Sequence, residues 1–229
     1  MSNASVPVPG ESRTEWHCVV LGDTSAGGFP RHLAVRLKHD LGVDATIHDW
    51  RRTGLTLVEL AEMLGSQMAL RSLVQRAEMV ILAVPVPRMG LCVNGQGEGL
   101  LGDMPLAMFM QTFRVDLNWA MNELLRLTSP QRALVRTMDF VCPSAAYWRR
   151  WAGMEACLAA WLALNDELHT MAAARAIPVA RLFQLFHGAA GDGDPWARGL
   201  FSGVEGEVSD AGASAVADAL SKLGYRRSR

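Results

Sequence analysis

Two neighbouring hydroxyl side chains, Thr24 and Ser25, lie in the stretch VVLGDTSAGG, residues 19–28. The apolar residues before them are typical of a buried strand, and the glycines after them are typical of a tight loop. A hydroxyl on such a loop acts as a nucleophile only if a neighbouring base takes its proton. The rest of the chain must therefore supply that base if the loop is catalytic.

Three side chains are candidates for the base. His187 follows the last predicted strand, and Glu205 and Glu207 precede the last predicted helix. Imidazole, with an ordinary pKa of about 6.5, suits proton transfer at neutral pH, whereas a carboxyl near 4.3 is a much weaker base unless burial raises its pKa. His187 is thus either a base that reaches Thr24 or Ser25 or a loop histidine without a role.

The remaining histidines differ in what is expected of them. His48 precedes Asp49 at the end of the second predicted strand and is a candidate for the same task on a par with His187. We expect His169 to form a solvated charge cluster with Asp166 and Glu167, its helical neighbours. Three other histidines are predicted to be structural or to lie on the surface: His17, His32 and His39.

Three arginines are candidates for holding an anionic group. Arg51 and Arg52 follow the second predicted strand, and Arg88 follows the third. Guanidinium groups recognise carboxylate, phosphate or sulfate through paired hydrogen bonds. Together with Glu205 and Glu207 they would suit a zwitterionic or sulfated metabolite, or the charges would pair with one another. Asp23 could be a metal ligand, but no second carboxylate or histidine lies at a fixed local spacing from it, so no metal site is predicted. No cofactor is predicted either.

The elements that must position these residues alternate between strand and helix. Short apolar runs predict buried parallel strands at 16–22, 43–49, 78–84, 133–142 and 177–183. Amphipathic stretches predict helices at 29–41, 55–76, 104–127, 147–175 and 209–223. The pattern predicts an α/β fold in three layers, a doubly wound sheet of five parallel strands. The connections at 85–103 and 184–208 are long, and function concentrates in such loops.

Composition narrows the class of protein. With 229 residues, half of them hydrophobic and a fifth charged, the chain is expected to form one domain over 16–229 behind a disordered lead-in, 1–15. A formal net charge of −1 and the absence of a long apolar run argue against nucleic acid or a membrane as partner. The four cysteines have no metal-site or disulfide spacing, which predicts reduced thiols and a cytoplasmic protein.

The residues quoted above resemble the SGNH (GDSL-type) hydrolase family of esterases, lipases and acyltransferases, over roughly residues 16–223. LGDTSAGG is similar to the family's Gly-Asp-Ser block, Gly54 to its second-block glycine, and SDAGASAVADAL to its last helix. The resemblance implies a flavodoxin-like fold of five strands. It also implies a nucleophile at Thr24, with Ser25 one step beyond, and an oxyanion donor at Gly54.

The resemblance fails at the remaining catalytic positions. The family's Gly-x-Asn-Asp block falls on Pro85–Arg88, so Pro87 replaces the asparagine donor. The catalytic histidine falls on Glu207 and its aspartate on Val204, and a shift by one residue places Val208 and Glu205 there instead. Neither alignment supplies an imidazole.

Three hypotheses follow. The first is an SGNH-fold protein that has lost ester hydrolysis and serves as a binding or partner subunit in a bacterial small-molecule pathway, as a homo-oligomer or with a catalytic homologue. Its interface would come from the methionine- and tryptophan-rich stretches 104–121 and 148–161, for which core packing is the alternative. The second is an enzyme that uses Glu205 or Glu207 as base for elimination, cyclisation or group transfer. The third retains acyl chemistry at Ser25 or Thr24 with His187 as base.

Overall fold

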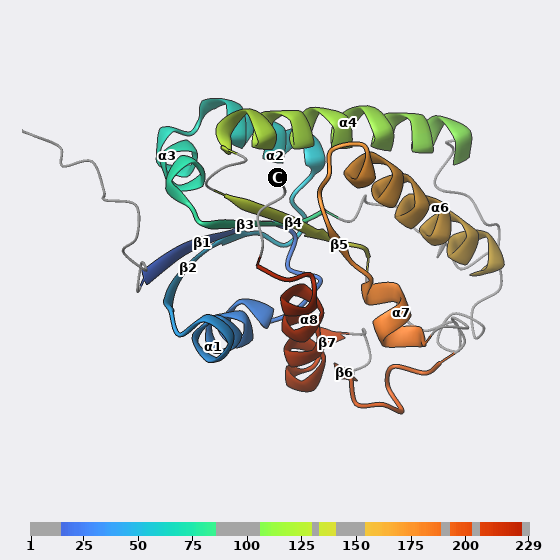
Figure 1. The fold of residues 1–229 in the computed structure, drawn as a ribbon. Helices are drawn as coiled ribbons and strands as arrows, with labels where there is room; N and C mark the ends of the chain where they lie inside the picture. Colours follow the sequence, from blue (N-terminus) through green and yellow to red (C-terminus); the bar gives the residue numbers. More distant parts are fainter. Residues whose placement is uncertain are drawn as a thin grey trace, which may run out of the picture.

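The chain is built around a five-stranded parallel sheet in the order β2-β1-β3-β4-β5 (Figure 1). The computed structural model describes residues 15–85, 106–129, 133–140, 154–188, 193–202 and 207–225. The five strands are β1 (Glu15–Gly22), β2 (Asp44–Arg51), β3 (Met79–Ala83), β4 (Leu134–Met138) and β5 (Val179–Ala180). The predicted doubly wound α/β fold is confirmed.

Helices cover both faces of this sheet (Figure 1). One face packs against α2 (Leu57–Ser66), α3 (Met68–Arg76), α4 (Leu106–Leu127) and α6 (Met154–Ala173). The opposite face packs against α1 (Phe29–Leu41), α7 (Leu182–His187) and α8 (Asp210–Lys222). Because side chains alternate along a strand, Val19 and Leu21 enter the first core, while Cys18 and Val20 enter the second.

The predicted helix 55–76 is divided in two. The backbone of Gln67 is extended, with φ −80° and ψ 103°, so α2 ends there and α3 begins at the next residue. Thr56 caps α2 by accepting a hydrogen bond from the amide of Glu59, whose side chain in turn accepts from the amide of Thr56. The prediction of one continuous helix was therefore wrong at this break.

The predicted strand 177–183 is also shorter than expected. β5 pairs with β4 only at Val179 and Ala180, and the apolar residues from Leu182 onward form α7. A side chain at the end of β4 helps to start this helix, because Asp139 Oδ1 accepts a hydrogen bond of 2.9 Å from the amide of Phe183. His187 consequently lies in a helical turn rather than directly after a strand.

A second, two-stranded sheet precedes the last helix. β6 (Phe201–Ser202) and β7 (Glu207–Val208) pair antiparallel, a hairpin that the sequence did not predict. Ser209 then caps α8 by accepting a hydrogen bond of 3.0 Å from the amide of Gly212. The predicted start of the last helix is confirmed.

None of the helices in the described ranges is both long and apolar enough to cross a bilayer.

Candidate functional site

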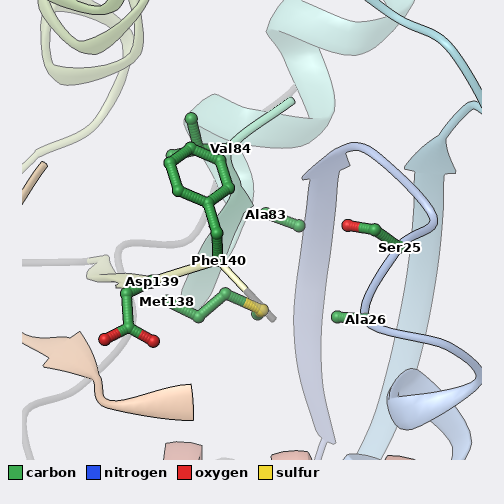
Figure 2. Close-up of a pocket in the computed structure, with 7 residues that line it drawn as sticks. All are labelled: Ser25, Ala26, Ala83, Val84, Met138, Asp139 and Phe140. Carbon is green, nitrogen blue, oxygen red and sulfur yellow. The ribbon is translucent and has the colours of Figure 1, made fainter. Parts of the chain in front are cut away.

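A pocket lies at the carboxyl ends of β1, β3 and β4 (Figure 2). The residues that line it are Ser25, Ala26, Ala83, Val84, Met138, Asp139 and Phe140. In a sheet of order 2-1-3-4-5, β1 and β3 flank the point at which the chain reverses its direction of winding, where ligands of such folds bind. Figure 2 shows the Ser25 hydroxyl directed toward Ala83 across this pocket.

Asp23 organises the loop that carries Ser25. Its Oδ1 atom accepts a hydrogen bond of 2.7 Å from the amide of Ser25, and Oδ2 accepts one of 3.3 Å from the amide of Gly54. The side chain is buried, so these bonds form with little competition from water. Asp23 thus joins the loop after β1 to the loop after β2.

The entry to this loop requires a glycine. Gly22 has φ +108°, and a Cβ atom placed there would lie 1.7 Å from the carbonyl oxygen of Ala83. The same carbonyl accepts a hydrogen bond of 3.0 Å from the amide of Asp23. The close approach of β1 and β3 therefore fixes the position of the backbone that carries Thr24 and Ser25.

The hydroxyl of Thr24 lies on the other side of the loop. Thr24 Oγ1 and Thr53 Oγ1 share a hydrogen bond of 2.8 Å, outside the set of residues that line the pocket. Of the two neighbouring hydroxyl groups, only that of Ser25 therefore belongs to the pocket.

Arg51 holds the loop from the β2 side. Its guanidinium donates two hydrogen bonds of 2.8 Å to Asp49 and one of 2.7 Å to the carbonyl of Gly27, and it lies over the ring of Phe29. Burial alone would raise the pKa of Asp49, but the hydrogen bonds from Arg51 outweigh it and leave that pKa below its usual value. All of these partners are protein groups. The role of Arg51 in binding an anionic group remains a prediction.

Arg52 is placed differently. It is exposed, and its guanidinium donates a hydrogen bond to the sulfur of Met63. Its amide donates to the carbonyl of Gly22, at 2.9 Å. Of the two neighbouring arginines, Arg52 is the more exposed.

A buried acid and a histidine, a pair that was not predicted from the sequence, meet at the end of β4. Asp139 Oδ2 lies 3.1 Å from Nε2 of His169, on α6, while Oδ1 receives the amide of Phe183. The Asp139 carboxylate points away from the Ser25 side of the pocket (Figure 2). It ties β4 to α6 and α7 and so fixes one wall of the pocket.

The predicted charge cluster around His169 is therefore wrong in its partners. Glu167 pairs with Arg114 on α4 through two hydrogen bonds of 2.6 and 2.7 Å, and His169 turns to Asp139 instead. The signals in the sequence were an acid directly after an apolar strand and a histidine four residues after Asn165, which places both on one face of a predicted helix.

His187 is buried in the last turn of α7. Its Nδ1 atom lies 3.2 Å from the carbonyl oxygen of Gly193, and its ring packs on Phe183 at 4.8 Å between centroids. Neither contact involves the loop of Thr24 and Ser25. Whether His187 serves as their base remains a prediction.

The other histidines lie away from the pocket. His17 and His48 stack on neighbouring strands, with 3.3 Å between Nδ1 and Nε2. His32 Nε2 lies 2.9 Å from Asp210, at the start of α8, and His39 contacts Asp40.

The predictions of reduced thiols and of no metal site can be compared with the structure only in the described residues. Cys18 is a free buried thiol, and desolvation together with the charge of Glu78 raises its pKa to about 12. Cys92 and Cys142 lie outside the described residues. Within the ranges that the structure describes, no group of three or more His, Cys, Asp or Glu side chains is arranged to hold a metal ion.

Comparisons with solved structures identify this architecture. A lipase from a goat rumen metagenome, Lip_vut3, superposes with a TM-score of 0.71 at 16% identity, over 93% of this chain and 99% of its own. A lipase/acylhydrolase from Enterococcus faecalis gives 0.62 at 12% identity over 93% and 99%, and a GDSL-like lipase from Bacteroides thetaiotaomicron gives 0.54 at 11% over 90% and 86%. The chain has the SGNH hydrolase fold. No protein-family model matches its sequence, and no curated protein does.

The position that holds the catalytic histidine in the resemblance to SGNH hydrolases falls on β7. Glu207 is exposed, and its carbonyl accepts a hydrogen bond from Ser202. Val208, the position one residue further, packs so closely on the loop that a Cβ atom at Gly27 would lie 2.9 Å from it. Because neighbouring strand residues point in opposite directions, Glu207 is directed away from the loop that Val208 contacts.

Four other positions of the SGNH resemblance lie outside the described residues: Pro87, Arg88, Val204 and Glu205. Gly54, at the position of the oxyanion donor, is described, and its amide is engaged by Asp23.

Proposed function

We propose that this chain binds a small molecule at the carboxyl edge of an SGNH-fold sheet and does not hydrolyse esters by a serine–histidine mechanism. The pocket at the switch point between β1 and β3 is the binding site. Its lining combines the Ser25 hydroxyl and the acid Asp139 with apolar residues such as Val84, Met138 and Phe140. Such a lining suits a small ligand that a few polar contacts orient between apolar walls.

The surroundings of the two hydroxyl groups are the observation that supports loss of hydrolysis. Thr24 is hydrogen-bonded to Thr53, and the amide of Ser25 is bound to Asp23. Across the described ranges, no imidazole nitrogen lies within hydrogen-bond distance of either hydroxyl. A serine or threonine hydroxyl is a weak nucleophile at neutral pH without a base beside it.

The oxyanion position adds to this support. In acyl transfer, an amide at this place must point toward the developing oxyanion, and one such donor is worth roughly 3–4 kcal/mol. The amide of Gly54 donates instead to the buried carboxylate of Asp23. An anion placed next to that carboxylate would be repelled, which disfavours the transition state of ester cleavage.

A fluorophosphonate probe tests the proposal directly. We expect no covalent labelling of the purified protein and no turnover of p-nitrophenyl acetate above that of the double variant Ser25→Ala, Thr24→Ala. Labelling of the wild-type protein that the Ser25→Ala exchange abolishes would overturn the proposal, since it would demonstrate an activated serine.

One observation favours a second candidate, acyl chemistry at Ser25. Ser25 lines the pocket and its hydroxyl is directed into it (Figure 2). The base would have to come from a group such as His187 after rearrangement. The probe experiment separates the two candidates, because this one requires labelling and turnover that are lost in both Ser25→Ala and His187→Gln.

A role as a partner subunit is proposed for the outer face of α4. Met108, Val115 and Trp119 are exposed there, whereas Phe113 and Met121 of the same helix are buried. Exposed apolar side chains along one helix are typical of a contact surface. Sedimentation of the wild-type protein and of a Val115→Glu, Trp119→Glu variant tests this role. A mass that equals one chain in both, alone and with a homologue, would contradict it.

A further inference from the structure

Two buried donors on α6 have no acceptor in the described part of the chain. They are the indole Nε1–H of Trp161 and the side-chain amide Nδ2 of Asn165. The two residues are 4% and 5% exposed, so water at the surface does not serve them. Buried polar groups in folded proteins are nearly always hydrogen-bonded, so an orphaned pair points to an acceptor from outside the described chain, either a water or a ligand atom.

Both donor residues contact Phe140, one of the residues that line the pocket. Phe140 lines the pocket, its ring packs on that of Trp161 with 5.5 Å between centroids, and its amide donates to Asn165 Oδ1 at 2.9 Å. That hydrogen bond also fixes the orientation of the Asn165 amide, since a flipped side chain would place one donor against another. Nδ2 is thereby directed away from the backbone of β4.

The spacing of the donors defines what they can hold. Trp161 and Asn165 are four residues apart, so they project from one face of α6, about 6 Å apart along its axis. His169 continues the same face by another turn and contacts Asp139. The stripe therefore presents two neutral donors beside an aromatic pair, with a buried carboxylate at its end.

We propose that Trp161 and Asn165 form a donor subsite behind Phe140, adjoining the ligand pocket, which takes the oxygen of a neutral carbonyl group such as an amide or a ketone. Both donors are uncharged, and the nearby Asp139 carboxylate disfavours an anion at this place. A carbonyl oxygen has two lone pairs and can accept from both donors, while the adjoining aromatic rings contact the apolar body of the ligand.

This inference rests on the ligand-binding part of the proposed function and not on the fate of ester hydrolysis. The test of the inference measures ligand binding alone, so covalent labelling of Ser25 would contradict the proposed loss of hydrolysis but not this subsite. Benzamide and benzoate serve as matched probes, since they share one ring and differ in charge.

The first readout uses the wild-type protein. In an NMR titration, we expect benzamide to shift the indole N–H signal of Trp161, and benzoate to bind more weakly. An indole signal that benzamide leaves in place would overturn the subsite, as would a persistent contact between that N–H and a bound water. Tighter binding of benzoate than of benzamide would overturn the assignment to a neutral carbonyl.

The second readout uses variants that remove each donor. Trp161→Phe keeps an aromatic ring against Phe140, and Asn165→Asp keeps the acceptor for the Phe140 amide while it replaces Nδ2 by an oxygen. Each should weaken benzamide binding about tenfold, the effect of one lost hydrogen bond that leaves its partner unpaired. Trp16→Phe, at the amino end of β1 and so at the opposite edge of the sheet from the pocket, is the matched control and should bind benzamide unchanged. Equal affinity in all four proteins would overturn the proposal.

Discussion

Asp23 Oδ2 accepts a hydrogen bond from the amide of Gly54, across 3.3 Å, while Oδ1 accepts from the amide of Ser25. One buried carboxylate thus fixes two loops that begin on different strands. Both amides would be left without this acceptor if the carboxylate were removed.

Asp23→Ala should therefore lower the free energy of unfolding by about 3 kcal/mol, because hydrogen bonds to a buried charge are strong. Asp23→Asn keeps an acceptor for only one of the amides and should lose roughly half as much. Urea denaturation measures both. Glu207→Gln, at an exposed position, is the control and should change stability by less than about 0.5 kcal/mol. An equal loss in Asp23→Ala and the control would contradict the prediction.

Gly22→Ala should be among the most damaging single exchanges in the sheet. The new Cβ would lie 1.7 Å from the Ala83 carbonyl, so β1 and β3 would have to separate. We expect a loss of more than about 4 kcal/mol, or no folded protein. Gly42→Ala is the matched comparison, since Gly42 also has a positive φ, of 67°, with nothing within 4 Å. It should cost only about 1–2 kcal/mol, and similar melting temperatures for the two variants would show that close approach is not the cause.

Asp139→Ala should loosen α7. The exchange removes the acceptor for the Phe183 amide together with the partner of His169, and we expect a loss of about 3 kcal/mol. Hydrogen exchange at the Phe183 amide should become faster. In His169→Ala, by contrast, Asp139 still accepts from Phe183, so exchange at that amide should stay slow. Faster exchange in both variants would mean that the helix depends on packing rather than on this hydrogen bond.

Stability should fall between about pH 7 and 5 through His48. Desolvation, followed by the charges of His17 and Arg76, holds the pKa of His48 below its usual value in the folded protein. The unfolded chain therefore binds a proton more readily, and acid favours unfolding. His48→Gln should reduce this loss when denaturation is compared at both ends of the window. A loss of stability as large as that of the wild-type protein would exclude His48 as its source.

The sequence was sufficient to predict the elements whose periodicity is unambiguous. β1, α1 and α8 were predicted to within one or two residues, because β1 is a short uninterrupted apolar run, the apolar positions of the two helices recur at helical spacing, and Ser209 supplies a cap. The run IPVARLF was assigned to a strand, because short apolar segments look alike in strands and helices. Asp139, some forty residues earlier in the chain, contributes to the helical outcome through its contact with Phe183.

The loops that form the site could be predicted from the sequence, but the side-chain contacts within it could not. The expectation that the loop of Thr24 and Ser25 lies at the carboxyl edge followed from its place after a strand, and Ser25 does line the pocket. The contact between Asp139 and His169, and the orphaned donors of Trp161 and Asn165, depend on how α6 is rotated against β4. No local pattern encodes that rotation.

The close contact between Val208 and Gly27 limits how this scaffold can be re-engineered. A Glu207→His substitution would place the imidazole in solvent. A Val208→His substitution would place it against the backbone of Gly27, where there is no room for a larger side chain. Placing an imidazole against the loop of Thr24 and Ser25 would therefore require a change in the path of the backbone before α8, and not one substitution alone.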